Sequence, residues 1–365
     1  MSDITGILRR FCLTLAPSGY EGRMAAALKD ELLPYCDDIS CDRAGNVIGF
    51  IGGTDDAPLN VMVFAHMDSV GFVVRSIEPN GLIRIDRLGG IPEKALPALK
   101  VSIFTEDGDS VDGVIGIKSH HGMTAEEKLR VDTIGSLAVD IGASSADEVR
   151  AAGIEVGCFA AYRPEFQTLL GTRVSGTAID DRGGCAALVE IARLASENPP
   201  PCNLYIVGTV WEEFNLRGAM VAARSINPDV GIALDVCLTG DTPESAGRFE
   251  TALSNGPVLT SYSFHGRGTL NGTLSHRGLM NSVKAAALDR ELPLQRFAST
   301  GILTDASYLQ LENDGVACVE LAYPARYTHS PIEVCDTEDL LRLAQLVSAT
   351  LERLDSSFDP ARYRI

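Results

Sequence analysis

Histidine and acidic side chains stand where apolar stretches of this sequence stop. A continuous apolar run, Val61 to Ala65, ends in His66, Met67 and Asp68. Such runs are typical of strands buried on both faces of a parallel sheet, and open α/β sheets bind ligands at the carboxyl ends of these strands. In an extended chain, His66 and Asp68 point the same way. The pair could therefore hold a metal ion, form a hydrogen-bonded dyad, or serve only as hydrogen-bonded structure.

Four other predicted elements begin or end at similar side chains. They are Asp180 and Asp181 at the start of a helix predicted over 181–195, Glu212 and Glu213 after a strand at 203–210, Asp235 after a strand at 230–234, and His329 beyond a strand at 316–322. Strand ends that meet at one edge of a sheet would bring these groups together. Two imidazoles with three or more carboxylates suit a pair of divalent cations such as zinc, cobalt or manganese. No cysteine is among them, so a closed structural zinc site is not indicated.

Each acidic group also has a structural interpretation. Adjacent acids such as Asp180 and Asp181 are commonest on solvated turns. Glu212 and Glu213 could cap a helix predicted to begin near residue 216, and Asp235 could be an N-cap. These separate explanations do not account for the shared position of the acids and both histidines at one edge of the sheet.

The elements that position these groups follow an α/β pattern. Ser18 to Glu21 has the form of a capping box, which predicts a helix directly after it. Strands are predicted over 46–51 and 59–65, and a final helix is predicted to have Asp336 or Thr337 as its N-cap. Buried strands alternating with amphipathic helices indicate an α/β fold with a mixed, mostly parallel sheet covered by helices.

The middle of the chain has a different pattern. Between residues 71 and 167, short β-type runs alternate with turns rich in glycine, proline and aspartate. Because α/β sequence lies on both sides, this stretch is predicted to be a small β domain inserted into one catalytic domain. The catalytic domain would then consist of residues 1–70 and 168–365.

Composition narrows the possible partners. The formal net charge of −18 argues against nucleic acid and anionic membrane surfaces, because both would be repelled. No segment approaches ~20 apolar residues without a charge, the length that a membrane helix needs. Nine cysteines without a C-x-x-C pair indicate neither a disulfide framework nor a zinc knuckle. We therefore expect a cytoplasmic protein.

A set of short motifs, taken in order, resembles the tetrahedral (TET) aminopeptidases of the glutamyl aminopeptidase family, some of which were once classed as endoglucanases. The motifs are APSGYEG, GNVIG, AHMDSVGF, GVIG, VDIGASS, GTAIDDRGGCAAL, WEEFNLRGA, LTDAS and RYTHSPIE, and they span nearly the whole chain. Each motif is weak alone, but the ordered set is specific. The resemblance implies a zinc-peptidase-like catalytic domain and a metal-dependent aminopeptidase that acts on short peptides.

The resemblance also implies two divalent ions per subunit. The implied ligands are Asp180 as the bridge, His66 and Asp235 for one ion, and Glu213 and His329 for the other. Glu212 would be the general base that takes a proton from a water held between the ions. Asp68 would orient His66. A cis peptide is expected between Asp180 and Asp181.

The inserted β domain of this family builds twelve-subunit hollow tetrahedra from dimers, so the resemblance implies a homo-oligomer. His120 and His121 belong to a glycine-containing loop of the insert. This loop is either a solvent-exposed connection or a segment that binds substrate at the rim of a neighbouring subunit's active site. The segment 300–303 departs from the family, which usually has a glycine pair there. Together with Thr304 and Asp305, it is expected to line the substrate pocket.

Two other functions are compatible with the same sequence. The metal site could serve a deacylase or amidase acting on a small non-peptide amide. The chain could also be a catalytically silent assembly protein that keeps the fold. The second alternative is disfavoured, because Glu212 and all five implied ligands are present.

Overall fold

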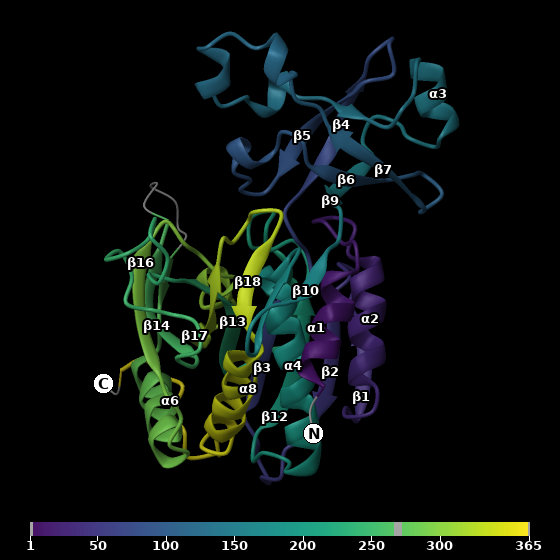
Figure 1. Cartoon of the computed structure of the whole chain (residues 1–365). Helices are drawn as coiled ribbons and strands as arrows, with labels where there is room; N and C mark the ends of the chain where they lie inside the picture. The colour runs from purple at the N-terminus through teal and green to yellow at the C-terminus, as the bar shows by residue number, and fades with distance from the viewer. Residues whose placement is uncertain (1–2, 266–271, 364–365) are drawn as a thin grey trace.

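The computed structural model describes residues 3–265 and 272–363. They form an α/β body and a separate β barrel, which lies above the body in Figure 1. The main path of the body's sheet runs β1-β2-β12-β3-β13-β17-β18-β11-β10. Its strands are β1 (Asp38–Cys41), β2 (Val47–Ile51), β3 (Asn60–His66), β10 (Phe166–Thr168), β11 (Arg173–Gly176), β12 (Asn203–Thr209), β13 (Val230–Leu238), β17 (Ala317–Arg326) and β18 (Glu333–Asp336).

The centre of this sheet is parallel and its margins are antiparallel. β12, β3, β13 and β17 pair in parallel, whereas β1, β2, β18, β11 and β10 pair antiparallel. Beside β17, the sheet is extended by β14 (Val258–Phe264), β15 (Gly272–Leu274) and β16 (Gln295–Thr300). The predicted α/β fold with a mixed sheet is confirmed, and its parallel part is the part that carries the candidate site.

Helices cover both faces of the sheet because its central strands are apolar on both sides. Along β3, Val61, Val63 and Ala65 pack into one hydrophobic core, and Met62 and Phe64 pack into the other. The first core is covered by α1 (Ile4–Cys12), α2 (Gly22–Leu32), α4 (Ile179–Glu197), α6 (Arg277–Asp289) and α8 (Thr337–Leu351). The second is covered by α5 (Gly218–Ile226) and α7 (Ala306–Leu309).

Two predicted helix starts have different outcomes. Asp336 is the N-cap of α8, and its side chain accepts a hydrogen bond from the Glu338 N–H, as predicted. The predicted capping box at Ser18 to Glu21 is wrong, because α2 has no side-chain cap. The Ser18 hydroxyl donates to Asp68 Oδ2 instead, at 2.6 Å. A tertiary contact with the candidate site has replaced the local one.

The stretch predicted as an inserted β domain forms a closed antiparallel barrel in the order β4-β5-β8-β7-β6-β9. Its elements are β4 (Gly71–Ile77), β5 (Ile83–Leu88), η1 (Glu93–Ala95), β6 (Lys100–Phe104), β7 (Ser110–Ile115), η2 (His120–Gly122), η3 (Glu127–Leu129), η4 (Ile134–Ser136), β8 (Val139–Asp140), α3 (Ala146–Ala151) and β9 (Phe159–Tyr162). The barrel has a hydrophobic core of its own. β10 then returns the chain to the sheet of the body. The domain boundaries after residues 70 and 167 stay predictions.

Among the helices that the structure describes, none is long and apolar enough to cross a membrane.

Candidate metal centre

The predicted site residues lie where the parallel strands open at their carboxyl ends. His66 is the last residue of β3 and pairs in register with Thr209, the last residue of β12. The pairing of β3 with β13 stops at Phe64 and Ala233. β13 itself continues, so the prediction that its strand ends before Asp235 is wrong. Asp235 lies in the part of β13 that no longer pairs with β3, and it lines the cavity in front of the sheet.

Asp180 lies between the two histidines. Its Oδ1 is 3.1 Å from His66 Nε2, and its Oδ2 is 3.5 Å from His329 Nε2. Glu213 Oε1 is 3.4 Å from the same nitrogen of His329. The two oxygens of one carboxylate thus face different imidazoles, which is the arrangement that a bridging ligand requires. The expected cis peptide between Asp180 and Asp181 is present.

These distances can be compared with those around a bound ion. Nitrogen and oxygen ligands of a tetrahedral zinc ion, each about 2.0–2.1 Å from the metal, lie roughly 3.3–3.4 Å apart. Two groups of side chains have ligand atoms within 4.8 Å of one another: His66, Asp180 and Asp235, and Asp180, Glu213 and His329. The groups share Asp180. Their donor types and spacing fit a pair of divalent cations.

Glu212 lies beside this cluster and faces the same cavity. Its Oε2 is 4.0 Å from His66 Nε2. The cavity has a volume of about 710 Å³, and His66, Asp180, Glu213, Asp235 and His329 also line it. A carboxylate at this place can exchange a proton with a small molecule held between the two groups of ligands.

Asp68 has more contacts than its predicted role requires. His66 Nδ1 lies 3.1 Å from the main-chain oxygen of Asp68 and 3.6 Å from its carboxylate. The carboxylate accepts the main-chain N–H groups of Glu212 and Glu213, at 3.0 and 3.1 Å. With the Ser18 hydroxyl, it therefore makes three hydrogen bonds. Asp68 fixes the loop that carries the predicted base and one candidate ligand, and its main chain contacts His66.

The structural interpretations of the acidic pairs do not hold. Asp181 is fully buried, so the pair at 180–181 is not a solvated turn. The helix after Glu212 and Glu213 begins only at Gly218, and its N-cap is Arg217. Neither glutamate caps it.

Crowding of buried carboxylates changes their protonation. Burial raises the pKa of Glu212 well above its ordinary value, and repulsion from Asp235 and Glu213 adds to this effect against the attraction of His66. Burial likewise raises the pKa of Glu213 to about 7. Burial also disfavours the ionised form of Asp180, but the hydrogen bond with His66 and the charges of both imidazoles bring its pKa below the ordinary value. Bound cations would favour ionisation of the whole cluster, so its electrostatics also fit a metal centre.

Sequence reasoning missed Glu333, a second buried acid behind the cluster. Its Oε2 accepts the Asp180 N–H at 2.8 Å, and its Oε1 accepts the His329 N–H at 2.6 Å. Burial and the repulsion of Asp180 raise the pKa of Glu333 well above its ordinary value. The residue closes the RYTHSPIE motif, and its place four residues after His329 was the only signal available. Glu333 therefore links Asp180, the candidate ligand shared by both groups, to His329, which belongs to one group.

The residues predicted to contact substrate lie elsewhere. Thr304 and Asp305 are buried, and neither lines the cavity. The Thr304 hydroxyl donates to Glu320, and Asp305 accepts from Thr209, both at 2.8 Å. The preceding residues, 301–303, form the wall instead.

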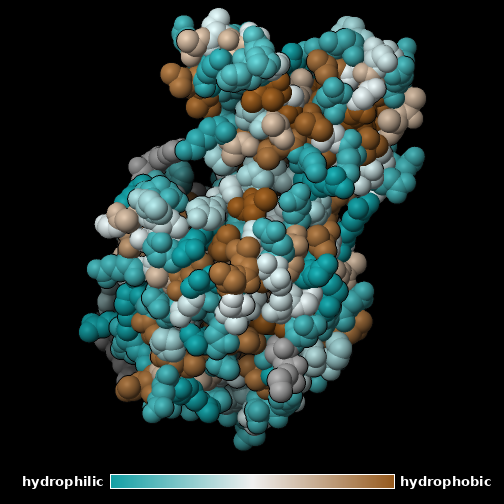
Figure 2. Space-filling model, in the orientation of Figure 1, coloured by the Kyte–Doolittle hydropathy of each residue, from teal (hydrophilic) through white to brown (hydrophobic). Residues whose placement is uncertain are grey.

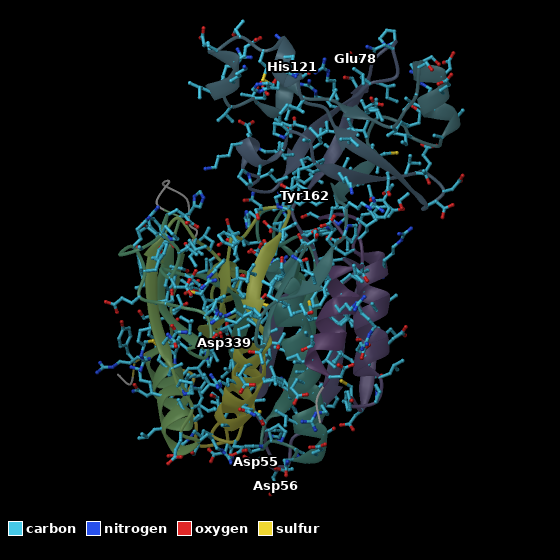
Figure 3. The ribbon with its side chains drawn as sticks, viewed as in Figure 1. Asp55, Asp56, Glu78, His121, Tyr162 and Asp339 are labelled. Atoms are coloured by element: carbon cyan, nitrogen blue, oxygen red, sulfur yellow. The ribbon has the colours of Figure 1, made fainter. Side chains whose placement is uncertain are left out.

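His120 and His121 are exposed on η2 of the barrel. Figure 3 shows His121 at the end of the barrel remote from the body. The structure therefore does not bring this pair to the candidate metal centre of its own subunit.

A parallel-centred α/β body, with imidazoles and carboxylates gathered at the carboxyl edge of its sheet, fits the class of metal-dependent hydrolases. Comparison with known families gives the second step. Residues 45–346 match the profile of the M42 glutamyl aminopeptidases, and the chain belongs to this family. It is a metal-dependent aminopeptidase, as the ordered motifs predicted.

Individual relatives align over nearly the full length. The lysyl aminopeptidase of Pyrococcus furiosus is 36% identical over 92% of this chain and 93% of its own length. The solved TET aminopeptidase of a marine sediment Thaumarchaeota archaeon is 29% identical and has a TM-score of 0.90. The match covers 97% of this chain and 97% of that protein. The Pyrococcus horikoshii TET1 peptidase, which can assemble into a tetrahedron or a large octahedral shell, is 28% identical with a TM-score of 0.83, over 97% of this chain and 100% of its own.

Proposed function

We propose that this enzyme uses two divalent ions to release N-terminal residues from short peptides. His66, Asp180 and Asp235 would hold one ion, and Asp180, Glu213 and His329 the other. The observation that carries this assignment is that the two carboxylate oxygens of Asp180 face different imidazoles, Oδ1 toward His66 and Oδ2 toward His329. When bound, such ions supply an acidified water and polarise the scissile carbonyl.

The protein's own groups complete the chemistry. Glu212 faces the cavity next to His66, where it accepts a proton from the attacking water and passes it to the leaving amine. Because bound cations would favour the ionised form of Glu212, its carboxylate is available to take the proton and later return it. Asp68 holds the Glu212 main chain in place through its carboxylate. The roles of base and positioning residue thus fall to different acids.

The cavity wall favours a neutral, apolar N-terminal side chain. Apart from the metal-centre residues, the wall includes Val236, Leu238, Ile302, Leu303 and other apolar groups. Among the described residues, no carboxylate outside the metal centre and Glu212 lines the cavity. A lysine side chain would therefore find no separate partner there, and burying an unpaired charge is costly. The basic residues of the wall, Arg87 and His265, would favour an acidic residue instead.

The function is tested with a panel of aminoacyl-nitroanilides and acylated small amides, assayed with Co²⁺, Zn²⁺ and Mn²⁺. We expect metal-dependent cleavage, with kcat/KM for leucyl-nitroanilide at least about tenfold above that for the glutamyl and lysyl substrates. N-acetyl-leucyl-nitroanilide is the matched control for a free amino terminus and should not be cleaved. Preferential cleavage of acylated amides would instead identify a deacylase. No turnover with any metal would identify a silent assembly protein.

We also propose that the barrel mediates self-association into dimers and then a dodecamer. Leu129 on η3 is 89% exposed, and Ile117 and Val131 are about half exposed on the same domain. Figure 2 shows apolar side chains on the surface of the upper, barrel part of the molecule. Exposed apolar groups on a small domain favour an interface. The tetrahedral assembly of the Pyrococcus horikoshii relative supports the same conclusion.

In such an assembly, His120 and His121 are proposed to reach a neighbouring active site. Dissociated subunits should then keep their metal affinity but lose activity. His120→Ala or His121→Ala should lower kcat/KM without dissolving the oligomer, as measured by steady-state kinetics beside size-exclusion chromatography. Monomers with undiminished activity, or an oligomer structure with both rings far from every metal centre, would contradict this role. The segment would then be a solvent-exposed connection.

We place the enzyme in the cytoplasm. All nine cysteines are free, and six of them are buried, which suits a reducing compartment.

A further inference from the structure

A loop of the barrel reaches the candidate metal centre. It connects β5 to η1, and its residues Gly90, Ile91 and Pro92 line the cavity beside the candidate ligands, together with Arg87 of β5. Within this loop, the main-chain oxygen of Gly90 lies 2.6 Å from Nδ1 of His329. The other ring nitrogen of His329, Nε2, faces Asp180 and Glu213. The inserted domain therefore contacts a ligand contributed by the body.

Two adjacent glycines make this approach possible. Gly89 has φ +83°, and a Cβ there would lie 2.9 Å from a methyl group of Val70 and 3.3 Å from Oε2 of Glu213. A Cβ at Gly90 would lie 3.1 Å from His329 Nδ1. Contacts this short force the neighbouring group to move. Larger residues at either position would push the loop away from Glu213 or His329, which explains a glycine pair at the end of a strand.

The two candidate ion sites differ in how their imidazoles are held. The ring of His66 has its outer contact within its own strand end, where Nδ1 is 3.1 Å from the main-chain oxygen of Asp68. The ring of His329 has its outer contact with the barrel. The main chain of His329, which has φ +63°, is held separately by Glu333. The inserted domain thus contacts the ring of His329, whereas the main chain of His329 is held by Glu333 of the body.

We propose that the barrel supplies a positioning group of the metal centre: the main-chain carbonyl of Gly90, which orients His329 toward the ion it shares with Glu213. This inference rests on the proposed two-ion function. An Nδ1–H donated to the carbonyl fixes the tautomer and leaves the Nε2 lone pair free for the metal, and outer contacts of this kind strengthen metal binding. The barrel thus holds the imidazole of one ion site, whereas the imidazole of the other is held within the body.

A second part of the barrel supports this arrangement. Tyr162, at the end of β9, is labelled in Figure 3 at the junction between barrel and body. It lines a narrow cavity together with Asp180, Glu213 and Glu333. The barrel therefore meets the Glu213 side of the centre at two places.

The test is isothermal titration of the metal-free full-length enzyme with Zn²⁺, comparing wild type with Gly90→Ala. We expect the variant to bind one ion with wild-type affinity and the other about 10–100-fold more weakly, the usual effect of losing an outer contact to a ligand. Gly135→Ala is the matched control, because it lies in the same domain and its Cβ would meet nothing within 4 Å. It should titrate as wild type does.

A double variant separates positioning from general damage. In a His329→Ala background, Gly90→Ala should change zinc affinity no further, because the carbonyl acts only through the ring. Wild-type binding of both ions by Gly90→Ala would overturn the inference and leave the proposed function standing. A wild-type enzyme that binds none of Zn²⁺, Co²⁺ and Mn²⁺ would instead overturn the proposed function. If Gly90→Ala does not fold, a zinc-loaded wild-type crystal structure decides: a Gly90 oxygen beyond hydrogen-bond distance from His329 Nδ1 contradicts the proposal.

Discussion

Glu212→Gln is expected to lower kcat about 10²–10⁴-fold, the usual contribution of a general base, while both ions remain bound. Glutamine keeps the size of the side chain but cannot accept the proton. The loop should stay in place, because Asp68 holds it through the main-chain N–H groups of Glu212 and Glu213 and not through their side chains. The measurements are steady-state kinetics and metal content per subunit by plasma mass spectrometry.

Glu190→Gln is the matched control for this experiment. Glu190 is also a buried glutamate, but it lies on α4 and pairs with Arg193 at 2.8 Å, outside the metal centre. Its substitution should leave kcat within about twofold, since a partly exposed ion pair contributes little. Near-normal turnover by Glu212→Gln would remove Glu212 from the role of base.

The second large effect is expected for Asp180→Ala. Each carboxylate oxygen of Asp180 faces a different imidazole, so its removal takes a ligand from both ions at once. Metal content should fall at both positions, and activity should fall with it. Loss of only one ion would contradict the bridging role.

The neighbouring residue provides the comparison. Asp181 accepts hydrogen bonds from the Gly184 N–H at 2.9 Å and from the Tyr323 hydroxyl at 3.0 Å, and so holds the start of α4. Asp181→Asn should disturb the geometry of the site more than its metal content. A kcat decrease without loss of both ions is the expected result.

The sequence was sufficient to predict that the candidate ligands lie together, because their position follows from sheet geometry. A continuous apolar run that stops at His66 predicts a two-sided buried strand and a polar side chain at its carboxyl end. The same reasoning located Glu213 and His329. The predicted strand ended just before Asp235, whereas β13 continues to Leu238 after its pairing with β3 has stopped.

Contacts between distant segments could not be predicted in this way. Ser18 has the local pattern of a helix cap, yet its hydroxyl binds Asp68, and nothing in a window of a few residues distinguishes the two outcomes. Glu333 contacts Asp180 from 153 residues away, and Gly90 contacts His329 from 239 residues away, so no local pattern links either pair. The strands β14 to β16 were not predicted either: β14 joins the sheet beside β17, and β15 and β16 pair with β14.

The most direct test of the two-ion site is anomalous X-ray scattering at the zinc edge from crystals of the zinc-loaded enzyme. We expect two peaks in each subunit, about 3.5–4 Å apart as in other two-metal sites. One should contact His66, Asp180 and Asp235, and the other Asp180, Glu213 and His329. A single peak, or two peaks of which only one contacts Asp180, would contradict the proposed two-ion site.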